Sequence, residues 1–233
     1  MKDLFGKAIL DFQTNTSPEN MITSTSISDE DEMEVAYLFR SFAEMPTLEQ
    51  KALQLAKGSV LDVGCGAGSH TLALQNEMNL DVTAIDISEN AVAQANRNAA
   101  LNKLDHIVKF EAMNAFDVLK NWGKEGRKYD VVMLDPPAFT KSRSSIEKAV
   151  TGYKEINLRG MKMINNGGFL VTSSCTNLVS PELFLDTIYM AAKDAKKRIR
   201  QVTYQSQSSD HPIIWGMENT HYLKFLIVEV CDR

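Results

Sequence analysis

The chain has 233 residues, of which 44% are hydrophobic and 24% charged, and its net charge is −5. This composition is that of a folded globular domain and excludes a disordered, collagen-like or coiled-coil chain. No apolar run approaches the roughly 20 residues of a membrane span, and the N-terminus lacks the pattern of a secretory signal. We therefore expect no membrane partner. Three dispersed cysteines predict neither disulfides nor a zinc site, so we expect a reducing cytoplasm and no bound metal.

The N-terminal part is predicted as an extension or lid over residues 1–45, ahead of a catalytic domain over 46–233. Residues 1–57 contain ten acidic and five basic residues, whereas the remainder is neutral. Ser, Thr and Asn are frequent over 13–28, which is typical of a linker or an irregular lid. We therefore expect this part to lie outside the main core.

Two helices are predicted before the pattern changes. The acidic run 29–34 leads into an amphipathic stretch over 35–42, where apolar residues recur at helical spacing. Thr47 opens the second helix, and Gly58 ends it.

From residue 59 onwards, short β-branched runs alternate with helical stretches. We expect strands over 59–63, 82–87, 107–112, 129–135, 168–174, 199–204 and 221–230, and helices over 72–78, 89–102, 115–122, 145–165 and 181–196. This alternation predicts an α/β fold with a doubly wound, mostly parallel sheet of seven strands. Because no helix separates the last two strands, they are predicted to form an antiparallel hairpin at the sheet edge.

A glycine-rich segment follows the first strand of this pattern and contains Asp62, Gly64, Gly66 and Gly68. Glycines let a backbone turn tightly and approach a ligand, although a purely structural turn has the same composition. A dinucleotide-binding loop has its third small residue at position 69, which here is Ser69. A carboxylate at 62 repels a pyrophosphate but can pair with an ammonium group. The pattern therefore favours S-adenosylmethionine as the ligand.

The next two strands also end in polar residues. Asp86, followed by Ile87, ends the second strand, where an acid can reach the paired hydroxyls of an adenine nucleoside. Asn114 and Ala115 follow the third strand, at a position that borders the adenine in this architecture. The Asn114 side chain either faces the exocyclic amine or caps the following helix, and both roles are compatible.

Asp135 and two prolines follow the fourth strand, and Cys175 ends the fifth. The prolines cannot extend the strand, so they constrain the backbone where the reactive methyl group would sit. Ligands of open α/β sheets bind outside the carboxyl ends of the strands, which places Cys175 at the same edge as the three aspartates. A buried cysteine is more often an apolar filler than a nucleophile, so both interpretations stay open from position alone.

Together these residues resemble class I S-adenosylmethionine-dependent methyltransferases. From about residue 91, the segments AVAQANRNAALNKL, YDVVMLDPPAFTKSRSS and GFLVTSSC resemble the catalytic domain of bacterial large-subunit ribosomal RNA cytosine-5 methyltransferases. That resemblance implies Cys175 as the nucleophile and Asp135 as the group that assists at the base. The RNA-binding PUA domain and β-rich connector of that family have no counterpart here. Residues 1–80 instead resemble the lead-in of uncharacterised Bacteroidetes methyltransferases.

Three functions are compared on these grounds. The resemblance implies methylation of carbon 5 of a cytosine in RNA, and residues 140–200 hold eleven basic and five acidic residues that suit phosphates or solvated helix faces. The alternative is a small-molecule or protein methyltransferase in which residues 1–57 cover the substrate, as the acidic lead-in favours. A non-catalytic binding module is opposed by the intact glycine loop, Asp62 and Asp135.

Overall fold

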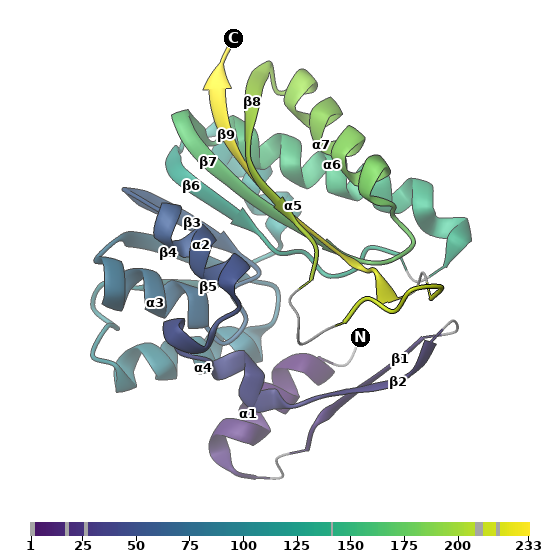
Figure 1. Cartoon of the computed structure of the whole chain (residues 1–233). Helices are drawn as coiled ribbons and strands as arrows, with labels where there is room; N and C mark the ends of the chain where they lie inside the picture. The colour runs from purple at the N-terminus through teal and green to yellow at the C-terminus, as the bar shows by residue number, and fades with distance from the viewer. Residues whose placement is uncertain (1–2, 17–18, 26–27, 141, 208–211, 218–219) are drawn as a thin grey trace.

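A computed structural model describes the chain except residues 1–2, 17–18, 26–27, 141, 208–211 and 218–219, and the side chains of 23–31. Seven strands form one sheet (Figure 1): β3 (Ser59–Val63), β4 (Asp81–Asp86), β5 (Lys109–Ala112), β6 (Tyr129–Leu134), β7 (Ile164–Cys175), β8 (Lys197–Gln205) and β9 (Leu223–Asp232). Their order across the sheet is β5-β4-β3-β6-β7-β9-β8. The strand order reverses beside β3, which makes the carboxyl end of β3 the expected ligand-binding position.

The pairing confirms the predicted sheet. β3 pairs in parallel with β4 and β6, and β6 pairs in parallel with β7. β9 is inserted antiparallel between β7 and β8, from the pair Gly168–Val230 to the pair Cys175–Leu223. The start of β9 therefore lies beside the end of β7, at the edge where the parallel strands finish.

Helices cover both faces of the sheet (Figure 1), which is why the central strands are apolar on both sides. Val131 and Met133 pack in one hydrophobic cluster, whereas Val132 and Leu134 pack in another. The first face carries α2 (Thr47–Leu55), α3 (Ser69–Met78) and α4 (Glu89–Leu101), and the second carries α5 (Ala115–Lys124), α6 (Ile146–Lys162) and α7 (Pro181–Asp194). No helix in the described part of the chain is long and apolar enough to cross a bilayer.

The N-terminal region is more ordered than the sequence predicts. The expected linker contributes to α1 (Leu4–Thr14) and to β1 (Met21–Thr25), which pairs antiparallel with β2 (Ser28–Met33). The linker prediction over 13–28 was wrong for these parts because Ile and Thr are β-branched and suit an extended strand. Residues 17–18 and 26–27 lie outside the described residues.

The helix expected over 35–42 is also different. It forms two short 3-10 helices, η1 (Val35–Phe39) and η2 (Phe42–Glu44), separated by extended backbone at Arg40 and Ser41. The Glu44 carboxylate accepts hydrogen bonds from the backbone N–H and hydroxyl of Ser41, at 2.9 and 2.7 Å. This local capping starts a new turn and replaces a continuous helix.

α1 packs against the glycine loop and α4. The Ile9 side chain is fully buried in a cluster with Ala67 and Ala91. The Asp3 carboxylate accepts from the backbone N–H of Gly6 at 2.8 Å and from the Ser88 hydroxyl at 2.5 Å. The chain ahead of residue 46 therefore contacts the edge of the sheet where β4 ends, and its division from the catalytic domain at residue 45 stays a prediction.

Candidate active site

The glycine loop between β3 and α3 requires glycine at three positions, each with positive φ. A Cβ on Gly64 would lie 2.8 Å from the carbonyl oxygen of Asp135, and one on Gly68 would lie 2.9 Å from Phe110 Cζ. Gly66 has φ +52 and faces open space, with no atom within 4 Å of its Cβ position. The loop therefore approaches other atoms closely at Gly64 and Gly68 and leaves open space beside Gly66, which is partly exposed, so a nucleoside ligand can approach the backbone there.

Asp86 braces this loop from the end of β4. One of its oxygens accepts from the backbone N–H of Gly66 at 3.0 Å, and the other accepts from the N–H of Ser88 at 2.8 Å. The next residue, Ile87, is 73% exposed and offers an apolar surface beside the carboxylate. A carboxylate oxygen can accept more than one hydrogen bond, so Asp86 keeps lone pairs for ligand hydroxyls.

Asn114 caps α5, because its side-chain oxygen accepts from the backbone N–H of Phe116 at 2.9 Å. Asn114 itself is exposed, and Ala115 is partly buried at the first position of the helix. The helix-cap interpretation of Asn114 is therefore shown. A contact with adenine remains a proposal.

Asp62 lies buried at the carboxyl half of β3 and is 3% exposed. Its Oδ2 accepts from the Thr71 hydroxyl at 2.7 Å. Burial raises the pKa of Asp62, and this effect outweighs the opposing influence of His70 and the Thr71 hydrogen bond. A cationic ligand group beside this carboxylate would stabilise its charged form.

A cluster of polar residues beside Asp62 was missed from the sequence. His70 Nε2 lies 2.9 Å from Glu49 Oε2, and Arg40 Nη2 donates to the same oxygen at 3.1 Å. Burial lowers the pKa of His70, but the hydrogen bond to Glu49 and the charge of Asp62 outweigh it and raise the pKa overall. The Arg40 guanidinium carbon lies 3.4 Å from the ring centroid of Tyr37. No motif links these residues, since they come from separate elements.

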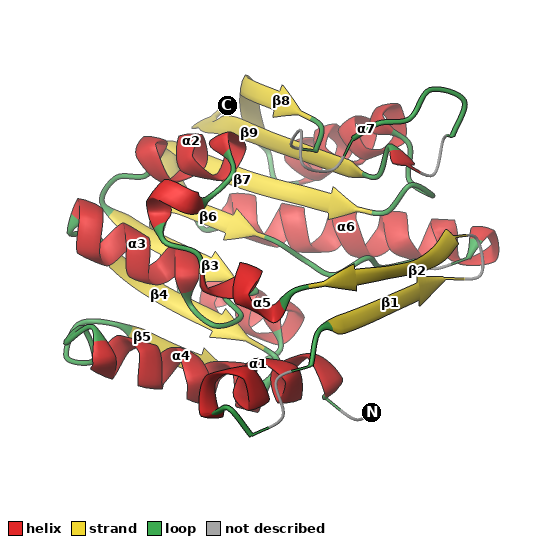
Figure 2. Cartoon of the chain, turned by 60° about the horizontal axis from the view of Figure 1, so that its bottom comes forward, coloured by secondary structure: helices red, strands yellow, loops and turns green. Residues whose placement is uncertain are grey.

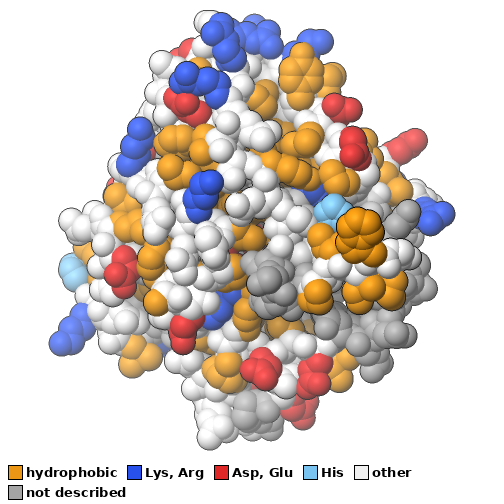
Figure 3. Space-filling model, viewed as in Figure 1, with side chains coloured by type: hydrophobic (Ala, Val, Ile, Leu, Met, Phe, Trp, Pro, Cys, Tyr) orange, Lys and Arg blue, Asp and Glu red, His pale blue; other side chains and the backbone are white. Residues whose placement is uncertain are grey.

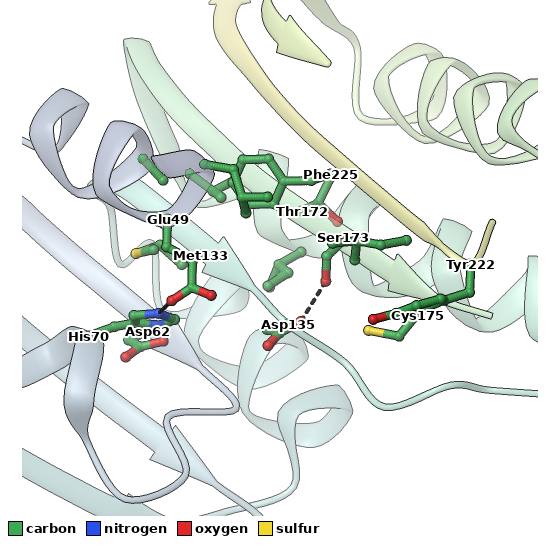
Figure 4. A pocket seen from close by; sticks show the side chains of 15 residues that line it. Glu49, Asp62, His70, Met133, Asp135, Thr172, Ser173, Cys175, Tyr222 and Phe225 are labelled. Atoms are coloured by element: carbon green, nitrogen blue, oxygen red, sulfur yellow. Dashed lines mark hydrogen bonds and ion pairs between the residues drawn. The ribbon is translucent and has the colours of Figure 1, made fainter. Parts of the chain in front are cut away.

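A cavity of about 210 Å³ connects this polar cluster with the cysteine (Figure 4). Glu49, His70 and Asp62 lie at one end and Cys175 at the other, with Asp135 between them. Apolar side chains from α2 and the strands complete the wall: Leu48, Ala52, Met133, Leu134, Val171, Leu223 and Phe225. Three predicted site residues, Asp62, Asp135 and Cys175, thus share one cavity. The other predicted site residues lie outside its lining: Gly64, Gly66, Gly68, Asp86, Ile87, Asn114 and Ala115.

The cysteine end of the cavity holds a hydrogen-bonded pair. The Ser173 hydroxyl donates to Asp135 Oδ1 at 2.5 Å, and Ser173 lies on the same side of β7 as Cys175. Cys175 has exposed surface, but protein atoms that enclose its thiol, together with the Asp135 carboxylate, raise its pKa to about 12. The Lys224 ammonium and Ser173 act in the opposite direction. Ser173 is a further residue that the sequence reasoning missed, although its spacing of two from Cys175 was a usable signal.

The other two cysteines lie away from the cavity lining. Cys65 is buried in the glycine loop, and burial together with Asp62 raises the pKa of its thiol. Cys231 lies near the end of β9, at the end of the sheet away from Cys175. Among the described residues, no group of three or more His, Cys, Asp or Glu side chains is arranged to hold a metal.

Comparison with known proteins places this site in a family. The model of the methyltransferase domain matches residues 55–223. The chain is 35% identical over 181 residues to ribosomal RNA large subunit methyltransferase I of Shewanella frigidimarina, covering 77% of this chain and 46% of that protein. It is 37% identical over 171 residues to the same-named protein of Tolumonas auensis, covering 72% and 43%. The chain therefore spans about half the length of these curated relatives.

A solved structure resembles the whole chain, including its N-terminal region. It is a SAM-dependent methyltransferase from Bacteroides fragilis in complex with S-adenosyl-L-homocysteine, with a TM-score of 0.67 and 24% identity. The match covers 99% of this chain and 95% of that one, which shows a shared fold. The family match and the fold agree with the sequence resemblance. The chain belongs to the methyltransferase domain family, as a class I S-adenosylmethionine-dependent methyltransferase.

Proposed function

We propose that the protein methylates carbon 5 of a cytosine in RNA through a covalent adduct with Cys175. The supporting observation is the shared cavity in which Cys175 and the Ser173–Asp135 pair lie at the carboxyl ends of adjacent strands. The names of the relatives, ribosomal RNA large subunit methyltransferase I, favour the same class of substrate.

Each residue of the cysteine end has a defined role in this proposal. Carbon 5 of cytosine is a poor nucleophile, and addition of the Cys175 thiolate at carbon 6 makes it enamine-like. Asp135, close to ring nitrogen 3, stabilises the protonated base that forms on this addition. S-adenosylmethionine supplies the methyl group to carbon 5. Loss of the carbon-5 proton to a base then expels the Cys175 thiolate and restores the aromatic ring.

The cofactor is proposed to lie across the glycine loop, with its amino-acid end toward Asp62. The Asp62 carboxylate would pair with the ammonium group of the cofactor, and the open space beside Gly66 would let the cofactor approach the loop. Asp86 accepts from the ribose hydroxyls. Ile87 and the Asn114–Ala115 turn border the adenine, because all these residues lie at the carboxyl ends of β4 and β5.

Among the basic residues that follow Asp135 in the chain, some form ion pairs and others are free for phosphates. Lys154 and Arg159 of α6 form ion pairs with Asp194 and Glu155. Exposed Arg143 and Lys148, which follow the Asp135 turn, form no ion pair with the described residues. They are therefore the best candidates for phosphate contacts.

A second group of Lys and Arg residues lies elsewhere. Lys197 and Arg200 at the start of β8 pair with Asp232 and Glu229 near the end of β9. This is the opposite end of the sheet from Cys175, and Lys and Arg side chains gather there in Figure 3. We therefore assign this group no part in binding the substrate.

The target base must leave its stack to reach the cavity, which favours a loop or unfolded RNA.

A trapping experiment tests the proposal. RNA that contains 5-fluorocytosine should form a covalent adduct with the wild-type protein, because the fluorine cannot leave as the proton does. Cys175→Ala should abolish the adduct and the methylated product while leaving cofactor binding nearly intact. Cys65→Ala and Cys231→Ala, which remove cysteines outside the cavity, should retain the adduct. Full methyl transfer by Cys175→Ala would reject covalent catalysis.

One observation favours the alternative, a small-molecule or protein substrate. The β1–β2 hairpin lies beyond the carboxyl ends of the parallel strands (Figure 2), and β2 has the acidic sequence SDEDEM. An acidic hairpin there repels a polyanion and attracts a cationic substrate. Methyl transfer from labelled cofactor to RNA, protein and metabolite fractions, measured side by side, distinguishes the two functions.

A further inference from the structure

A buried lysine lies next to the strand that carries the cysteine. Lys224 of β9 is 1% exposed and is paired in register with Ser174, the residue before Cys175. Its ammonium group donates to the carbonyl oxygen of Thr176, and to that of Tyr222 at 2.8 Å. Thr176 directly follows the cysteine, and Tyr222 lines the cavity. The ammonium group is thus held on the carbonyl of the residue next to Cys175, and it reaches this position from the other face of the sheet, which Lys224 shares with Ser174.

The buried Lys224 ammonium group has no carboxylate partner among the described residues. Burying an ammonium group is costly unless an opposite charge or several hydrogen bonds compensate. No carboxylate in the described part of the chain forms an ion pair with Lys224, and its two hydrogen bonds go to neutral carbonyls. Burial lowers the pKa of Lys224 to about 8, whereas the charge of an ionised Cys175 raises it.

We propose that Lys224 is a positioning residue that supplies the buried positive charge for the Cys175 thiolate. Its place on β9 keeps that charge fixed, because both carbonyls that hold it belong to segments that flank the thiol. The inference rests on the proposed function, since it concerns the same nucleophile. It nevertheless has its own test, because ionisation of a thiol can be measured without RNA.

Two other titratable groups face the thiol. The Asp135 carboxylate, from the turn after β6, opposes ionisation of Cys175. Tyr153 of α6 also lies within electrostatic reach, and burial raises the pKa of its hydroxyl, so it stays neutral below pH 9. Both groups are unchanged in variants of Lys224. A difference in thiol reactivity between those variants therefore reports on Lys224.

The test follows alkylation of Cys175 by iodoacetamide in the full chain between pH 6 and 9. Mass spectrometry of the tryptic peptide 163–193 isolates Cys175 from the other two cysteines. In the wild type, the logarithm of the rate should rise by about one per pH unit and then level off near pH 8. It levels off because Lys224 loses its proton there and the thiol becomes harder to ionise.

Substitutions separate charge from packing. In Lys224→Met, Cys175 should be alkylated about tenfold more slowly at pH 7, because the pKa of its thiol should be higher by about one unit. The plot of this rate against pH should then have no break. Lys224→Gln keeps a donor for the carbonyls but carries no charge, so it should behave like Lys224→Met. Lys224→Arg should keep the fast rate and show no break below pH 9, because arginine stays charged.

A matched control uses another largely buried lysine. Lys197 has a 10% exposed side chain and also donates to a backbone carbonyl, but it lies at the far end of the sheet. Lys197→Met should keep the wild-type profile with its break. A wild-type profile in folded Lys224→Met or Lys224→Gln would overturn the proposal, with folding checked by binding of S-adenosylhomocysteine. If the pH profile of Cys175 alkylation changes in the Lys224 variants while no RNA adduct forms, the role of Lys224 is supported and cytosine methylation is rejected.

Discussion

The Ser173 hydroxyl lies 2.5 Å from Asp135 Oδ1 and joins the ends of two neighbouring parallel strands. β6 contributes the carboxylate and β7 contributes the hydroxyl, two residues before Cys175. This bond fixes how the carboxylate faces the cavity. The orientation of the group proposed to assist at the base therefore depends on the same strand that carries the proposed nucleophile.

Ser173→Ala should slow methyl transfer about tenfold or more, because a hydrogen bond to a charged group is worth about 1.5–3 kcal/mol. Binding of S-adenosylmethionine, measured by calorimetry, should change little. Ser174→Ala is the matched control, since the Ser174 side chain points to the opposite face of β7. An equal loss of turnover in both variants would show that Ser173 has no specific role.

Asp86→Ala should weaken S-adenosylmethionine binding by about 1–3 kcal/mol, because the ribose hydroxyls of the bound cofactor would lose their hydrogen-bond acceptor. The same substitution leaves the backbone N–H groups of Gly66 and Ser88 without their partner, so the thermal unfolding midpoint should also fall. Asp117→Ala, at an exposed carboxylate of α5, is the control. Unchanged affinity in Asp86→Ala would reject the assignment to the ribose.

The His70–Glu49 pair should make stability depend on pH. The pKa of His70 is raised above 6.5 in the folded protein. Its contribution to the free energy of unfolding is therefore complete below pH 6.5 and is lost as the pH rises through the folded-state pKa. Although burial opposes it, the pKa of Glu49 is lowered below 4.5 by its bonds to His70 and Arg40, so its contribution is present above pH 4.5. The stability difference between wild type and His70→Gln should therefore be largest between pH 4.5 and 6.5.

Urea unfolding at pH 5.5 and 8.5 measures this difference. Exposed His106→Gln serves as the control and should show no such dependence. A gap between wild type and His70→Gln that grows toward pH 8.5 would contradict the assigned direction of the His70 pKa.

A chain that starts at residue 46 should fold but turn over substrate poorly. The complete seven-stranded sheet and its six covering helices lie within 46–233. Truncation removes Ile9 from its contact with the glycine loop and Arg40 from Glu49, so cofactor affinity should fall as well. Thermal unfolding and calorimetry measure both effects, and a chain starting at residue 20 isolates the contribution of α1. Aggregation without cofactor affinity would instead place the N-terminal region in the core.

Trp215 should report on RNA binding. It is 98% exposed at a turn in which the Met217 N–H donates to the Ile214 carbonyl at 3.0 Å and Gly216 has φ +85. Stacking of a base on this indole should quench its fluorescence, and Trp215→Ala should weaken RNA binding by about 1–3 kcal/mol. Trp122, the second tryptophan, is 6% exposed and should be unaffected. Equal quenching by polyphosphate, which has no bases, would argue against stacking.

The alternation of strands and helices from residue 59 onwards, and the order of the site motifs, could be predicted from the amino-acid sequence alone. These features depend on neighbours in the chain. Ser180 and Pro181, for example, predicted the start of α7, and the Ser180 hydroxyl accepts from the Leu183 N–H at 3.2 Å as a helix cap requires. The edge of the sheet at which Asp62, Asp135 and Cys175 meet also followed, because parallel strands end on one side.

The N-terminal region and the polar partners of the site were decided by tertiary structure. Extended β1 and β2 stabilise each other only as a pair, so the β-branched residues of this short Ser- and Thr-rich segment do not by themselves decide between a strand and a linker. Glu49 and His70, and Ser173 and Asp135, are brought together from different elements. Periodicity and motifs report contacts a few residues apart, whereas these pairs form only when the sheet assembles and places distant strands side by side.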